Sequence, residues 1–383
     1  MAKKIVVIGA GAWGGWTAFH LQMAGYEVTL IDQYGAGNAL SGSGDLTRII
    51  RMAYGGDKNY SALTARSFEL WRKYSKEFNT QMIYDRKALW MFRGINPAYA
   101  EESVPLMSEM GFKLEELPID VLKDQYPQVN FEDISRAYLE HDSAYLLASV
   151  SCQQVFRQFQ LCGGAFVQEK VIELVWEGSE VSAVRLANGE LVIADYFVLA
   201  CGPWLKQLVP EVSEFIKVSR QEVYYFNVPE TYHDLPIWVE FREGEEMFYG
   251  IPDHFRHGFK FAYDERTWLL DPDNDHRHIT EEILEKMKGI LSNRFPLLAD
   301  PMVLRHHTCV YENSPDGDFI IDRVPEASNA IMMAGSSGHG FKMGPALGEL
   351  ITEHLMSSRP IPKAFSFDRF NNSFQVKTQY QLK

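Results

Sequence analysis

The segment KKIVVIGAGAWGGWTAFHLQMAGYEVTLID, residues 3–32, constrains the fold of this chain more than any other. The apolar run Ile5–Ile8 predicts a strand that is buried on both faces. The stretch that follows predicts a helix that reaches about Ala24 and ends at Gly25, and Val28–Ile31 predicts a second strand. A strand, a helix and a strand in this order predict a parallel βαβ unit.

The glycines of this unit predict a dinucleotide site. Gly9, Gly11 and Gly14 have the spacing G-x-G-x-x-G, which allows a tight turn, close approach of a pyrophosphate and close helix–strand packing, respectively. The helix N-terminus attracts phosphates, and Asp32 can accept a hydrogen bond from a ribose hydroxyl. A glycine-rich turn without a ligand is the alternative, but strand, helix, strand and acid stand in the register of a binding site.

The motif alone does not separate NAD from FAD, and the next residues favour FAD. A simple Rossmann domain would repeat βαβ units here. Residues 33–47 instead form a polar loop rich in glycine and serine, followed by a basic strip and an amphipathic helix at 59–77. Loops of this kind wrap the longer dinucleotide in flavoproteins.

Further helices and strands are predicted along the rest of the chain. The patterns predict a helix at 144–162, short strands at 165–200 with a turn at Asn188-Gly189, antiparallel strands at 218–263, a helix at 280–293, and a strand, glycine loop and helix at 331–355. A length of 383 residues suggests two domains. Because dinucleotide-type elements stand at both ends, we predict a discontinuous FAD-binding domain (1–58, 145–215 and 310–383) and a discontinuous substrate-binding domain (59–144 and 216–309).

Charge and cysteine content narrow the class of protein. The formal net charge of −14 disfavours nucleic-acid binding. No apolar run approaches the roughly 20 residues of a membrane span, and the first residues are interpreted as a strand rather than a signal peptide, so we expect a cytoplasmic protein. The four cysteines form no CxxC pair, so neither a metal site nor a redox dithiol is expected, and a disulfide is disfavoured in a reducing cytosol.

Cys309 therefore needs an explanation of its own. It lies in the sequence RHHTCVYENSPDGDFIID, residues 305–322, which begins as a strand. Alternate residues of a strand share a face, so Arg305 and His307 are placed to favour a thiolate at Cys309. The alternative is a buried cysteine that packs as a small apolar residue.

Four motifs together resemble one known family. GAGAWGGWTA with Asp32, LTRIIRMAYG (46–55), CVYENSPDGDFIID (309–322) and GSSGHGFKMG (335–344) are similar, in the right order and over nearly the whole chain, to the monomeric sarcosine oxidase and N-methyltryptophan oxidase family. These are flavoprotein amine oxidases of the D-amino-acid oxidase superfamily. The resemblance implies an α/β (α+β) fold: a glutathione-reductase-type, Rossmann-like FAD domain with a mixed-sheet substrate domain.

The resemblance also implies roles for single residues. Cys309 matches the cysteine that attaches covalently to the flavin 8α-methyl carbon. Arg51 and Lys342 match the pair that holds the substrate carboxylate. Other implied cofactor contacts are Ser41, Thr47, Val171, Gly202, Trp204, Gly338, Gly340 and Phe341.

The catalytic assignments come from the same resemblance. Arg48 matches an arginine near the flavin ring, and Tyr249 an active-site tyrosine. Lys260 matches the lysine proposed to activate oxygen, and a lysine between two phenylalanines in a buried strand is costly without a function. Tyr311, two positions beyond Cys309, is expected to line the same cavity.

Two positions depart from the family pattern. Gly44 and Asp264 stand where sarcosine oxidases commonly have histidines. A missing imidazole at Gly44 predicts added volume, and a carboxylate at Asp264 predicts a substrate larger than sarcosine with a distal amine or hydroxyl. The alternative is that Asp264 faces solvent or pairs internally with Lys260 or Arg256.

The resemblance implies a monomeric FAD oxidase of the C–N bond of an amino acid or N-substituted amino acid, with imine and hydrogen peroxide as products. Its partners are the small amine substrate and molecular oxygen, without nucleic acid or membrane. Two alternatives stay open: an amine dehydrogenase with another electron acceptor, and a flavin-holding protein without turnover. A nicotinamide dehydrogenase fits less well, because FAD-type elements occur late in the chain.

Overall fold

The βαβ unit predicted at the start of the chain is present and lies at the centre of a six-stranded sheet. The computed structural model describes residues 2–264, 266, 268–371 and 376. β1 (Lys4–Ile8) pairs in parallel with β2 (Glu27–Ile31) and with β13 (Tyr196–Leu199). The sheet order is β19 (Ile320–Arg323), β20 (Ala330–Ala334), β13, β1, β2 and β9 (Ala165–Val167).

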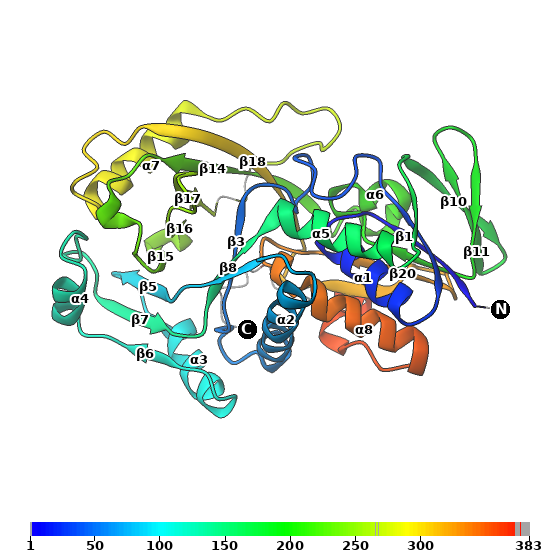
Figure 1. Cartoon of the computed structure of the whole chain (residues 1–383), viewed down its shortest axis with the longest axis horizontal. Helices are drawn as coiled ribbons and strands as arrows, with labels where there is room; N and C mark the ends of the chain where they lie inside the picture. Colours follow the sequence, from blue (N-terminus) through cyan, green and yellow to red (C-terminus); the bar gives the residue numbers. More distant parts are fainter. Residues whose placement is uncertain (1, 265, 267, 372–375, 377–383) are drawn as a thin grey trace.

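Helices cover this sheet near the dinucleotide motif. α1 (Ala12–Met23) packs against α5 (Ala148–Leu161) and α8 (Gly344–Ser357), and α8 also packs against α2 (Lys58–Glu77). These four helices lie together in Figure 1. The predicted end of α1 is confirmed, because its last turn closes at Ala24 and Gly25 then adopts φ +90°.

The second large sheet has eight strands and forms the other half of the molecule (Figure 1). Its order is β18 (Val303–Asn313), β14 (Lys217–Phe226), β17 (Phe259–Tyr263), β16 (Met247–Ile251), β15 (Ile237–Arg242), β5 (Ala88–Arg93), β7 (Arg136–Glu140) and β6 (Leu114–Glu116). The remaining helices are α3 (Ala98–Glu109), α4 (Ile119–Gln125), α6 (Leu205–Leu208) and α7 (Glu281–Arg294).

Two smaller sheets complete the fold. One contains β10 (Val171–Glu177), β11 (Glu180–Leu186) and β12 (Leu191–Ile193), and the other contains β3 (Thr47–Ile50), β8 (Ala144–Leu147) and β4 (Ile83–Asp85). The helix predicted over 144–162 therefore begins four residues late. The backbone of 144–147 pairs with β3 and β4, and this pairing prevails over the helical pattern.

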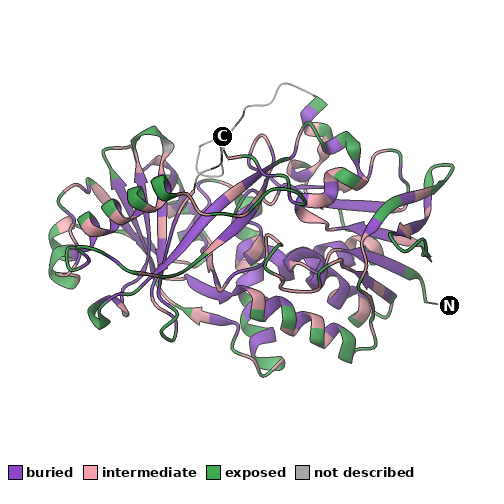
Figure 2. Cartoon of the chain, turned by 90° about the horizontal axis from the view of Figure 1, so that it is seen from above, coloured by how far each residue is buried: buried purple, intermediate pink, exposed green. Residues whose placement is uncertain are grey.

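The two halves meet along β18 and β3. β18 pairs with β14 along its length and extends toward the six-stranded half, so Val310–Glu312 lie beside the dinucleotide motif. In Figure 2 the strands of both sheets are mostly buried, and exposed residues gather on outer helix faces and loops. We keep the two-domain division as a proposal, and residues 372–375 and 377–383 of its last segment lie outside the described residues. Among the described helices, none is long and apolar enough to span a membrane.

Candidate active site

A long cavity begins at the glycine motif and ends near β18. Its empty volume is about 1210 Å³, counting the open mouth. Most of the predicted cofactor contacts line it: Gly9, Gly11, Asp32, Ser41, Val171, Gly202, Trp204, Gly338, Gly340 and Phe341. Gly14 instead serves packing, because a Cβ there would lie 1.9 Å from the carbonyl oxygen of Gly9.

The end of the cavity at α1 is prepared for a nucleotide. Asp32 Oδ2 accepts a hydrogen bond from Ala10 N at 2.8 Å, which holds the acid beside the turn. Ser43 Oγ accepts a hydrogen bond from Ala12 N at 2.9 Å and so shields the helix N-terminus. Gly9 adopts φ +104°, a conformation that favours glycine. Burial raises the pKa of Asp32.

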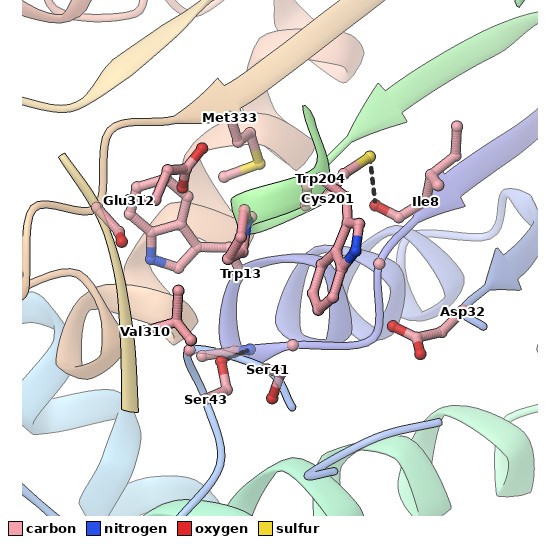
Figure 3. A pocket seen from close by; sticks show the side chains of 18 of the residues that line it. Ile8, Trp13, Asp32, Ser41, Ser43, Cys201, Trp204, Val310, Glu312 and Met333 are labelled. Carbon is pink, nitrogen blue, oxygen red and sulfur yellow. Dashed lines mark hydrogen bonds between the residues drawn. The ribbon is translucent and has the colours of Figure 1, made fainter. Parts of the chain in front are cut away.

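The shape and the polar groups of this cavity fit FAD. Figure 3 shows Asp32 and Glu312 on opposite sides of the pocket, with Trp13 and Trp204 between them. A carboxylate oxygen of Glu312 and the hydroxyl of Thr47 are buried without a hydrogen-bond partner in the described part of the chain. Glu312 lines this cavity, whereas Thr47 lines the second cavity described below. Buried polar atoms without partners are uncommon, so each of them indicates a ligand group that can form a hydrogen bond.

A second cavity adjoins the first. Its empty volume is about 670 Å³, and its wall combines apolar residues with buried cations. Arg48, Tyr311, Gly338 and Phe341 line both cavities. The ring of Tyr311 packs on Gly338, where an added Cβ would lie 2.5 Å from a ring carbon. The shared wall places any group held there in contact with both a nucleotide and a small molecule.

Two buried cations, Arg51 and Lys342, form one wall of the second cavity. Lys342 Nζ donates to His339 O at 2.9 Å, and Arg51 lies over the ring of Tyr54 at 4.5 Å. Burial lowers the pKa of Lys342 well below its ordinary value, and the charge of Arg51 lowers it further. Two buried cations repel one another, and an anion bound between them offsets the repulsion, so this site suits an anion.

Glu140, from β7, is an acid whose charge acts on Lys342 and is itself influenced by Arg51. It is fully buried and accepts a hydrogen bond from Met52 N. Burial raises its pKa to about 7, against the opposing effects of that hydrogen bond and of Arg51. Sequence reasoning missed this residue, since a single glutamate in a strand carries no recognisable signal.

Lys260 lies at the cavity edge and is paired. Its Nζ donates to Asp45 Oδ2 at 2.8 Å and to Thr47 O at 2.8 Å. Both side chains of the ion pair are buried, with 2% and 0% of their surface exposed. The sequence placed Lys260 correctly in a buried strand but gave no indication of Asp45, which lies 215 residues away.

Cys309 lies next to Arg48. The distance from Arg48 Nη2 to the sulfur is 3.4 Å. Burial raises the pKa of the thiol, but Arg48 and then His307 outweigh burial, so the pKa lies below its ordinary value. The expectation for Arg305 was wrong: its side chain is 41% exposed and lies 3.9 Å from Asp45, and Arg48 supplies the charge at the sulfur. Cys309 is buried and is not among the described residues that line either cavity, but its neighbour Arg48 lines both.

Three further predicted residues have different environments. Tyr249 lines the second cavity, where burial raises its pKa. Asp264 is held by Arg266 at 3.0 Å, so the predicted internal pairing occurs with a different partner. The volume expected at Gly44 is not present, because a Cβ there would lie 2.7 Å from Asn38 O. The loop folds back on itself at this point, and neither Asp264 nor Gly44 is among the described residues that line the two cavities.

Comparison with known proteins agrees with this geometry. The family model DAO, "FAD dependent oxidoreductase", matches residues 4–354. Monomeric sarcosine oxidase from Bacillus sp. (strain B-0618) is 27% identical over 93% of this chain and 92% of its own length. N-methyl-L-tryptophan oxidase from Salmonella heidelberg (strain SL476) is 24% identical over 94% of this chain and 96% of its own length. The solved structure of L-proline dehydrogenase from P. horikoshii superposes with a TM-score of 0.84 at 21% identity, covering 97% of this chain and 98% of that one.

Proposed function

This chain belongs to the family of FAD dependent oxidoreductases, and we propose that it oxidises the C–N bond of an amino acid or N-substituted amino acid. The observation that carries the proposal is the shared wall. A cavity that fits FAD and a smaller cavity with two buried cations have Arg48, Tyr311, Gly338 and Phe341 in common. Two of the proteins named above are a monomeric sarcosine oxidase and an N-methyl-L-tryptophan oxidase, which supports an amine substrate.

Arg51 and Lys342 bind the substrate carboxylate. The guanidinium presents a planar fork that matches a carboxylate, and the ammonium adds a point charge. A bound anion opposes the effects of burial and of the Arg51 charge, which lower the pKa of Lys342, and so favours the charged form of the lysine. Both groups line the same cavity as the residues of the shared wall. A carboxylate that they hold therefore leaves the rest of the substrate beside the cofactor site.

Apolar side chains hold the remainder of the substrate. Trp90, Val239, Phe241 and Met247 also line the second cavity. They exclude water and favour the neutral amine over the ammonium form. The second cavity is large enough for a substrate bigger than sarcosine, and its apolar lining favours an apolar side chain on that substrate.

When bound, FAD would supply the redox chemistry by taking up the two electrons that the substrate loses as its C–N single bond becomes the double bond of an imine. Arg48 lies at the junction of the two cavities, where its charge opposes negative charge that develops on the cofactor. Tyr311 borders the same junction, and Tyr249 lines the second cavity, so together they confine the reacting carbon. The resulting imine hydrolyses in water.

Two finer parts of the proposal concern attachment and the electron acceptor. Cys309 attaches covalently to the flavin, which the lowered pKa of its thiol supports, since the thiolate is the nucleophile. Oxygen is the acceptor and hydrogen peroxide the product, which the buried cation Lys260 at the cavity edge supports.

One experiment tests the function as a whole. The purified holoenzyme is supplied with a panel of amino acids and N-alkyl amino acids, and flavin bleaching is followed without oxygen, then peroxide with oxygen. Bleaching together with peroxide supports the oxidase, and bleaching without peroxide indicates the dehydrogenase alternative. If no member of the panel bleaches the flavin, the proposal is wrong.

A further inference from the structure

Asp45 is a buried acid at the centre of a cluster of charged and polar side chains, and it has no role in the function proposed above. Its carboxylate accepts hydrogen bonds from Lys260 Nζ at 2.8 Å and from Tyr225 OH at 2.7 and 2.8 Å. Arg48 Nη1 donates to the same carboxylate at 3.2 Å. The side chain of Asp45 has no exposed surface. One acid therefore holds Arg48, which lines both cavities, and Lys260, which lines the second.

These contacts fix the direction of the Lys260 ammonium. An ammonium has three N–H donors, and Lys260 directs one to Asp45 and one to Thr47 O. Lys260 also lines the second cavity. The third donor is used by no hydrogen bond among the described residues, and it remains for a group inside the cavity.

The backbone at Asp45 is held in an unusual conformation. Its φ is +80°, in the left-handed region that residues with side chains rarely adopt. Ser149 stabilises this conformation, because its N–H and its hydroxyl both donate to Asp45 O, at 3.2 and 2.9 Å. Strained backbone of this kind persists where the surroundings fix it, and it is concentrated at functional sites.

The pair also sets the charge of Lys260. Burial lowers the pKa of Lys260, and Asp45 opposes this effect. Burial raises the pKa of Asp45, but Lys260 and Arg48 outweigh burial and hold it below its ordinary range. Without the carboxylate, a buried lysine beside an arginine loses its proton more readily.

We propose that Asp45 is a positioning residue that holds Lys260 for the reaction of the reduced enzyme with oxygen. The inference rests on the oxidase function proposed above. Oxygen takes two electrons and one proton from the anionic reduced cofactor and a second proton from water, which gives hydrogen peroxide and the oxidised cofactor. Negative charge accumulates on oxygen during this step, and a fixed ammonium stabilises it.

Other groups near Lys260 also titrate or carry charge, and the test must separate them. They come from the loop before β3, from β3, β14, β16 and β18, and they are Asp45, Arg48, Tyr225, Tyr249, Arg305, His307 and Cys309.

The experiment measures the two half-reactions of the holoenzyme separately by stopped flow. Asn tolerates the left-handed conformation, so Asp45→Asn removes the charge without adding backbone strain. Reoxidation by oxygen should slow roughly tenfold or more, while anaerobic reduction by substrate changes far less. The loss should grow from about pH 6 to pH 9, since an opposite charge at this range shifts a pKa by about 1–3. Wild-type reoxidation should change less over the same range.

The double variant Asp45→Asn/Lys260→Met tests whether Asp45 acts through Lys260. It replaces a buried ion pair with a neutral pair, which proteins commonly tolerate. If Asp45 acts on reoxidation through Lys260 and not through Arg48, the reoxidation rate of the double variant should match that of Lys260→Met within about twofold. A double variant clearly slower than Lys260→Met overturns the inference, as does Lys260→Met reoxidising at the wild-type rate.

Glu240→Gln is the matched control. Glu240 is likewise a fully buried acid in an ion pair, with Glu240 Oε2 2.9 Å from Arg294 Nε, but its neighbours Val239 and Phe241 face the cavity and it does not. It should lose stability without changing the reoxidation rate. Equal slowing of reoxidation in Glu240→Gln and Asp45→Asn would mean that loss of any buried charge slows the reaction by destabilising the fold. The inference would then fail. Failure of wild type to produce peroxide would instead overturn the proposed function.

Discussion

Arg48 Nη2 lies 3.4 Å from the sulfur of Cys309, although the two residues are 261 positions apart in the chain. The contact places a fixed positive charge beside the sulfur, where it stabilises the thiolate form of Cys309. Arg48 itself lines both cavities.

Covalent attachment is the first prediction that follows. Acid-precipitated wild-type protein should keep its flavin colour, and Cys309→Ala should release the flavin into the supernatant. Arg48→Met should slow attachment, because the pKa of the thiol then rises, with His307 alone left to oppose burial. Cys152→Ala is the matched control, since Cys152 is also buried but its pKa is raised to about 12. Complete release of flavin from precipitated wild type would contradict covalent linkage.

The carboxylate anchor gives a second prediction. Removing one partner of a desolvated charge pair costs roughly 2–5 kcal/mol, so Arg51→Met or Lys342→Met should weaken amino-acid binding roughly 30-fold or more. The corresponding decarboxylated amine should bind almost as before. The measurement is the apparent dissociation constant from anaerobic flavin reduction. Equal losses for the amine and the amino acid would remove the carboxylate assignment.

Glu140 predicts a pH dependence of anion binding. Its pKa is raised to about 7 by burial. Below this value Glu140 is neutral and the charges of Arg51 and Lys342 are unopposed; above it the carboxylate competes with the bound anion. Affinity for an unreactive carboxylate such as acetate should therefore fall as pH rises through 7, by an amount on the order of tenfold.

Glu140→Gln separates this effect from titration of Lys342, which has the same sign. The variant should bind the carboxylate more tightly than wild type above pH 7, and the fall near that pH should be reduced. Titration calorimetry measures both. An identical pH profile in the two proteins would assign the fall to Lys342.

Lys260 gives a fourth prediction, on the two half-reactions. Lys260→Met should slow reoxidation by oxygen much more than anaerobic reduction, because the ammonium stabilises charge only while oxygen is being reduced. Stopped-flow absorbance of the flavin measures each step. Equal slowing of both steps would assign Lys260 to substrate binding or folding.

Substrate preference is the last prediction. Asp264 is held by Arg266, while the second cavity is walled by Trp90, Phe241 and other apolar residues. We therefore expect a bulky apolar amino acid to have a higher kcat/KM than sarcosine, and Asp264→Asn to leave the ratio of basic to neutral substrates unchanged. Sarcosine as the best substrate would contradict the size argument. A drop in the basic-to-neutral ratio in Asp264→Asn would indicate that Asp264 takes part in substrate recognition.

Local sequence was sufficient for the dinucleotide half of the molecule. Gly9, Gly14 and Asp32 act within one βαβ unit, where the turn, the helix packing and the end of the strand are set by neighbours a few residues away. The strand, glycine loop and helix that lead to Pro345 were predictable for the same reason. Fold class and the FAD-type cavity could therefore be predicted before the structure.

The reactive cluster depended on contacts that no local pattern encodes. Asp45 meets Lys260, and Arg48 meets Cys309, because β3 and its preceding loop lie against β17 and β18. Residues 144–147 became a strand for a similar reason: their backbone pairs with β3, a partner far away in the sequence. The sequence alone determined which elements form and what chemistry their side chains carry. Only the tertiary structure decided which charges are neutralised, because the pKa of a buried group depends on neighbours that folding brings together from distant parts of the chain.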